Sequence, residues 1–169
     1  MTSLRWNDES VNDRPIWTHI VHLIVPKAIS NPDSFFLQSS NFGNFIQPAR
    51  KRRSLEEEYA KDLPRTKTFA IKTGVVCGLL NQNPNYPIRF TADSPSDPFI
   101  YGVEGQYFGK HSDGVLAQAW KNFITSVMGG APDFNQLGQP VMAKATIRAL
   151  DLMAEETFQK QEIIPSKLA

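Results

Sequence analysis

Hydrophobic and polar residues follow strand-like patterns in the first half of the chain. Residues 16–25 are rich in β-branched and aromatic side chains and are closed by a proline, which predicts a strand. After a turn signal, residues 34–38 predict a second, shorter strand. Residues 68–80 contain a compact apolar strand, and residues 86–90 predict a further short one.

A helix is expected between the second and third strands. The pattern Ser54-Leu55-Glu56-Glu57 has the form of a capping box, in which the first and fourth side chains satisfy free backbone N–H groups. It predicts a helix over residues 54–62, and Pro64 would end this helix because proline cannot continue it.

The two longest helical patterns lie in the second half of the chain. Residues 115–128 repeat apolar side chains at i, i+1, i+4 and i+5, after a cap at Ser112 or Asp113 and before Gly129-Gly130. The core side chains expected from this helix are Trp120, Phe123 and Val127. A second helix is expected over residues 141–158, with a proline in its first turn. Its apolar positions, broad enough to pack on two sides, are Met142, Ala145, Ala149, Leu152 and Met153.

Strands interspersed with amphipathic helices favour an α/β layer fold. The number of strands is low for a closed α/β domain of this length, which indicates an incomplete sheet. We expect a single partial domain over residues 1–169. It would comprise a strand-rich part (1–90), an irregular surface stretch (91–111), a helical part (112–160) and a terminal linker (161–169).

Length, charge and cysteine content narrow the class of protein. A chain of 169 residues suits one domain, and its formal charge of +1 gives no global reason to expect nucleic acid or an acidic membrane as partner. The single cysteine, Cys77, excludes an intrachain disulfide, and no segment has the roughly 18 apolar residues of a membrane-spanning helix. Residues 1–15 are charged and lack the apolar region of a signal peptide, so the chain as written is expected to stay in the cytoplasm.

Cysteine and histidine are the first candidates for chemistry, and each has a structural alternative that we favour. Cys77 could be a nucleophile, but a cysteine between Val76 and Gly78 in a buried strand is more often inert packing. His19 and His22 are three residues apart on a strand and cannot converge on one metal ion, because strand side chains alternate between faces. We expect His19 to be a strand residue with satisfied hydrogen bonds.

The remaining polar and aromatic groups also favour structural roles. His111 and Asp113 fit a helix-capping neighbourhood. The basic run 50–53 abuts three glutamates, which favours a solvated helix start over a nucleic-acid site. The acidic residues of the irregular stretch lack metal-ligand spacing; they are Asp93, Asp97 and Glu104. Its aromatic residues, which can line a groove or cover a core, are Phe99, Tyr101, Tyr107 and Phe108.

Four motifs occur in an order that resembles one known family. They are a first strand bounded by tryptophan and proline, a strand followed by a Pro-Asn-x-Pro turn, an acidic residue before an Ala-Trp-x-x-Phe helix, and a helix with proline, methionine and Lys-Ala near its start. They occupy residues 15–26, 74–90, 113–123 and 140–151. In this order they resemble the PhoPQ-activated pathogenicity-related family, from about residue 4 to residue 167.

The resemblance implies an incomplete α/β-hydrolase-like sheet with two amphipathic helices packed on it. Family members continue into a Gly-x-Ser-Lys-Arg-Gly turn that resembles a nucleophile elbow, and no Gly-x-Ser-x-Gly occurs in these 169 residues. The loop 39–44 has serines where the family has glycines, which weakens an oxyanion role. The chain would be the amino-terminal fragment of a serine hydrolase or peptidase, catalytically silent alone. No catalytic, cofactor-binding or metal-ligating residue is assigned, and no cofactor is expected.

Two alternatives stay open. One family member is a secreted amoebal autocrine proliferation repressor, so the chain could belong to a secreted binding protein that uses residues 91–111 as a recognition loop. The other is a self-contained enzyme built on Cys77 and a histidine. The partner is unknown, but the strand at residues 75–80 is expected to lie at an open sheet edge, where self-association is possible.

Overall fold

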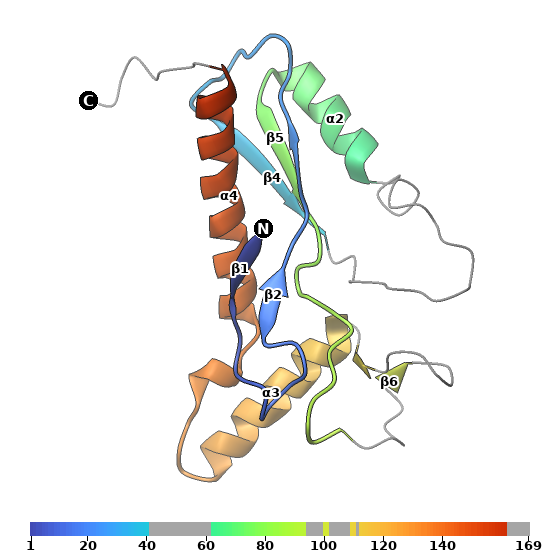
Figure 1. Ribbon diagram of the computed structural model, residues 1–169, viewed down its shortest axis with the longest axis vertical. Helices are drawn as coiled ribbons and strands as arrows, with labels where there is room; N and C mark the ends of the chain where they lie inside the picture. Colours follow the sequence, from blue (N-terminus) through green and yellow to red (C-terminus); the bar gives the residue numbers. More distant parts are fainter. Residues whose placement is uncertain (41–61, 94–99, 102–108, 111, 162–169) are drawn as a thin grey trace.

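The chain forms a small sheet between helices, in a computed structural model that describes residues 1–40, 62–93, 100–101, 109–110 and 112–161 (Figure 1). The strands are β1 (Thr2–Arg5), β2 (Ile16–Thr18), β3 (Val21–Ile24), β4 (Phe35–Ser39), β5 (Val76–Leu80), β6 (Ile100–Tyr101) and β7 (Gly109–Lys110). The helices are α2 (Asp62–Thr73), α3 (Ser112–Met128), the 3₁₀ turn η1 (Phe134–Gln136) and α4 (Gln139–Gln161). This mixture of helices and strands confirms the α/β class.

The central sheet has the order β3-β5-β4. β5 is antiparallel to β3, with Leu23 opposite Gly78, and parallel to β4, with Phe35 opposite Val76. All five residues of β5 are buried. A strand buried on both faces is typical of a sheet covered by helices on each side, and the continuous apolar character of β5 fits that position.

One helix covers each face of this sheet. On one face, the rings of Phe36 and Phe69 lie 4.6 Å apart, which places α2 against β4. On the other face, a Cβ atom added to Gly78 would meet the sulfur of Met153 at 2.3 Å, so α4 approaches β5 closely where glycine stands. Helix α2, the sheet and α4 therefore form three layers (Figure 1).

Helix α4 packs on the sheet through side chains spaced four residues apart, which lie on one side of a helix. They are Ala145, Ala149, Met153 and Thr157, all buried, whereas Val141, one turn earlier, belongs to the hydrophobic cluster around Trp6 and Trp17. The helix starts near the carboxyl end of β5, where Thr146 contacts Asn83, and Met153 lies at the middle of the strand. It therefore runs antiparallel to β4 and β5.

A second core lies below the sheet, around the hairpin of β1 and β2. The rings of Trp6 and Trp17 meet edge to face with centroids 5.4 Å apart, and both side chains are buried. The indole N–H of Trp6 donates to the carbonyl of Asn135 at 3.0 Å, which ties the hairpin to η1. The other buried members of this core are Tyr86, Ile88, Phe90, Val115, Ala119 and Val141.

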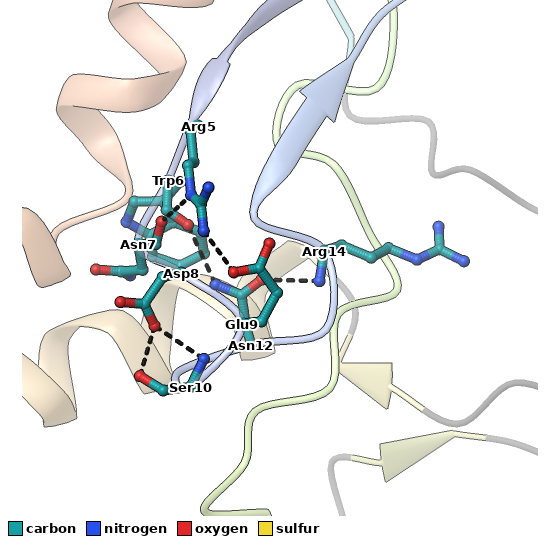
Figure 2. A network of polar contacts seen from close by, with 8 residues as sticks. All are labelled: Arg5, Trp6, Asn7, Asp8, Glu9, Ser10, Asn12 and Arg14. Atoms are coloured by element: carbon teal, nitrogen blue, oxygen red, sulfur yellow. Dashed lines mark hydrogen bonds and ion pairs between the residues drawn. The ribbon is translucent and has the colours of Figure 1, made fainter.

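The loop between β1 and β2 is held by polar contacts (Figure 2). The carboxamide of buried Asn12 donates to the carbonyl of Trp6 at 3.2 Å and accepts from the backbone N–H of Arg14 at 2.9 Å. Asp8 accepts from the backbone N–H of Ser10 at 2.8 Å, and Arg5 forms an ion pair with Glu9 at the surface. The charged residues Arg5, Asp8 and Glu9 near the start of the chain therefore stabilise the turn between β1 and β2.

Several predicted elements are confirmed with small shifts. The second strand, expected at 34–38, is β4, and the apolar strand within 68–80 is β5. The two long helices are α3 and α4, and α3 ends at Met128 before the two glycines, as predicted. The single run predicted at 16–25 is instead divided into β2 and β3, because each half pairs with a different strand.

The prediction that Pro64 ends a helix is wrong. Helix α2 begins at Asp62 and holds Pro64 in its first turn, where its missing N–H costs no hydrogen bond. Residues 54–61 lie outside the described part of the chain. The segment predicted as a strand at 86–90 forms only single bridges, with Ile88 opposite Lys110 and Phe90 opposite Asn12.

Two predictions about exposure are also wrong. Strand β5 is not at an open edge, because β3 and β4 pair with its two sides; in the described sheet β3 and β4 are the edge strands. Trp120 and Val127 are not core residues, because they are 44% and 45% exposed on α3, and Phe123 is half-buried. The buried side chains of α3 are Val115, Gln118 and Ala119.

Candidate functional site

Polar side chains gather where β4 and β5 end. Because these strands are parallel, their carboxyl ends meet at one edge of the sheet, which is where α/β sheets bind ligands. The group comprises Ser39, Ser40, Asp62, Asn83 and Thr146, and we refer to it as the carboxyl-end cluster.

Asn83 links this cluster across the layers. Its carboxamide nitrogen lies 3.3 Å from the hydroxyl of Ser39, 3.3 Å from the hydroxyl of Thr146 and 3.2 Å from the carbonyl of Met142. The hydroxyl of Ser40 donates to a carboxylate oxygen of Asp62 at 3.2 Å. The cluster thus joins the end of β4 to the start of α2 and to the first turns of α4.

Asn81 stands beside the cluster with an unsatisfied side chain. Its backbone is fully used, because its N–H donates to the carbonyl of Ile20 at 2.9 Å and its carbonyl accepts from His19 at 3.3 Å. Its buried carboxamide has no partner on either polar atom, and the carboxamide oxygen of Asn83 has none. Such groups cost about 1–3 kcal/mol each and are concentrated at functional positions.

The cluster combines hydroxyl groups with one carboxylate, that of Asp62. None of its members is an imidazole, and the contact between Ser40 and Asp62 lacks the histidine of a hydrolytic triad. The backbone N–H of Ser40 donates to the carbonyl of Leu80 at 2.7 Å, so it is not available to an oxyanion. Residues 41–44 of the loop implied to have that role lie outside the described part.

One serine and one histidine do meet elsewhere. The hydroxyl of Ser3 lies 2.7 Å from Nε2 of His19, whose Nδ1 faces the carbonyl of Asn81. A neutral imidazole with a proton on Nδ1 satisfies both contacts. Burial lowers the pKa of His19, and a backbone carbonyl stands where a triad would have a carboxylate. The expected hydrogen bonds of His19 are present, but the prediction that it is a strand residue is wrong, because it lies between β2 and β3. The contact with Ser3 was not predicted.

Cys77 is a packing residue, as expected. It is buried, its thiol donates to the carbonyl of Val75 at 3.3 Å, and burial raises its pKa. Its neighbours across the sheet are Ile24 and Phe36. His22 pairs instead with Leu79, so no histidine stands opposite the thiol in the sheet. This arrangement gives no support to a Cys/His enzyme.

The structure assigns Asp93 a role that the sequence did not reveal. Its carboxylate lies 3.2 Å from the ammonium of Lys110, and both side chains are almost fully buried. Asp113 is exposed in the first turn of α3, which fits its predicted place at the start of the helix. The other candidates lie outside the residues whose side chains are described: His111, residues 50–53, Asp97, Glu104, Phe99, Tyr101, Tyr107 and Phe108.

A shallow depression of about 420 Å³ on α2 is lined by Pro64, Arg65, Thr68, Phe69 and Lys72. No group of three potential metal ligands occurs among the described residues. No helix in that part of the chain is long and apolar enough to cross a membrane.

Comparison with known proteins decides the family. Residues 1–166 match the family model described as PhoPQ-activated pathogenicity-related protein. The chain belongs to this family. The resemblance seen in the four sequence motifs is thereby confirmed.

The chain is also similar to autocrine proliferation repressor protein A of Dictyostelium discoideum. It is 25% identical to this PhoPQ-activated pathogenicity-related chain over 156 residues. The match covers 92% of this chain but 26% of the relative, so the chain spans about a quarter of that relative's length. No solved structure matches the chain.

Proposed function

We propose that this chain is the amino-terminal part of an α/β-hydrolase-like protein and does not catalyse hydrolysis by itself. The observation that carries this proposal is the carboxyl-end cluster. It places hydroxyl and carboxamide groups at the edge where an α/β sheet binds ligands, with no imidazole base among its members. The intact protein would be a serine hydrolase or peptidase whose nucleophile lies outside these residues.

The direction of α4 supports this proposal. The helix runs antiparallel to β4 and β5, so it ends near the amino ends of these strands. A following parallel strand of a right-handed βαβ unit would start there. Within the described sheet β4 has a neighbour on one side only, so it offers an edge for that strand. A nucleophile elbow needs such a strand, because the serine sits on a sharp turn between strand and helix.

The relative sizes of the proteins point the same way. This chain spans 26% of the length of its Dictyostelium relative, which leaves most of a longer polypeptide to supply the nucleophile, the base and the acid.

The test is covalent labelling with a fluorophosphonate probe, which reacts with activated serines. We expect no labelling of the folded 169-residue chain, while a serine hydrolase of known reactivity serves as positive control. A longer polypeptide that continues into a Gly-x-Ser-x-Gly-type turn is expected to be labelled at that serine.

Labelling of the short chain would contradict the proposal. The variant Ser3→Ala identifies the source, because Ser3 is hydrogen-bonded to a histidine in the described residues. Loss of labelling in this variant would show that the Ser3–His19 pair is a working nucleophile and base.

A second candidate function is a signalling or binding protein. The name of the Dictyostelium relative favours it. Its test is a proliferation or cell-binding assay with the purified chain. Replacing residues 94–108 by a glycine-serine linker would abolish the effect under this candidate, and the design spares the buried residues Asp93 and Lys110.

A further inference from the structure

We draw no further inference here: the strongest candidate, the buried and unpartnered carboxamide of Asn81 at the carboxyl end of β5, belongs to the site already described, and nothing in the described part of the chain shows which group would meet it.

Discussion

Two histidines with lowered pKa values, His19 and His22, lie beside strand β5 and the residue that follows it. His19 uses both ring nitrogens, one toward Ser3 and one toward the carbonyl of Asn81. Burial lowers the pKa of His19, and burial together with the nearby charge of Lys67 lowers that of His22. Both rings are therefore held neutral in the folded protein under conditions where an unfolded chain would take up protons.

This difference predicts loss of stability in mild acid. The free histidine pKa is 6.5, and the folded values lie below it, so the unfolded state binds more protons as the pH falls below that value. The free energy of unfolding should then decrease as pH is lowered, which melting between about pH 7.5 and pH 5.5 measures.

The variant His19→Gln identifies the source of this pH dependence. It should show a shallower decrease than the wild type over the same range. The lowered pKa values of Asp8 and Asp133 act below their usual value of 3.8 and leave this window unaffected. Equal slopes for variant and wild type would refute the assignment.

At the scale of elements, the ends of the helices depend on two glycines with positive φ. Gly74 follows α2 with φ +63°, and its carbonyl accepts from the backbone N–H of Ser30 at 2.9 Å. Gly130 follows α3 with φ +78°. Both adopt a conformation that favours glycine, but their surroundings differ.

We expect Gly74→Ala to be more destabilising than Gly130→Ala. A Cβ at residue 74 would lie 2.8 Å from the backbone nitrogen of Ser30, whereas a Cβ at residue 130 meets nothing within 4 Å. Backbone strain alone should cost about 1 kcal/mol at Gly130, and strain with the clash about 2–4 kcal/mol at Gly74. Urea unfolding measures both, and equal costs would contradict the contact with Ser30.

At the scale of the whole molecule, the ion pair of Asp93 and Lys110 is buried beside Phe90, a member of the second core. Asp93 accepts from the backbone N–H of Phe90 at 2.8 Å and pairs with Lys110 of β7 at 3.2 Å. The exposed fractions of the side chains are 3% for Lys110 and 1% for Asp93. The pair joins the turn after Phe90 to strand β7.

Breaking this pair from one side should be costly. Lys110→Met leaves a buried carboxylate without its cation, which typically lowers the free energy of unfolding by about 3–5 kcal/mol. The double variant Asp93→Asn, Lys110→Met should be less destabilised than Lys110→Met alone, as denaturant unfolding can show.

An exposed pair of the same chain provides the control. Arg5 and Glu9 form an ion pair with side chains 53% and 69% exposed. Arg5→Gln should therefore change stability by less than about 1 kcal/mol. A comparable loss in Arg5→Gln and Lys110→Met would mean that burial is not what makes the second pair important.

Local patterns were sufficient for the elements with strong periodicity. The spacing of apolar residues and the breakers at both ends predicted α3 and α4, and the apolar runs predicted β4 and β5. The order of four motifs also predicted the family. The helix α2 was missed because proline both ends helices and begins them, and a local pattern does not distinguish the two.

The sequence by itself determined the helices α3 and α4, the strands β4 and β5, and the membership of the family. Only the tertiary structure decided that β5 lies between β3 and β4, that one side of α3 is exposed, and that Ser3 meets His19 and Asp93 meets Lys110. The physical reason is that periodicity specifies which side of an element is apolar, whereas its partner is chosen by contacts between distant residues. In α3 apolar side chains occupy more than one side of the helix, and the fold buries only the side that carries Val115 and Ala119.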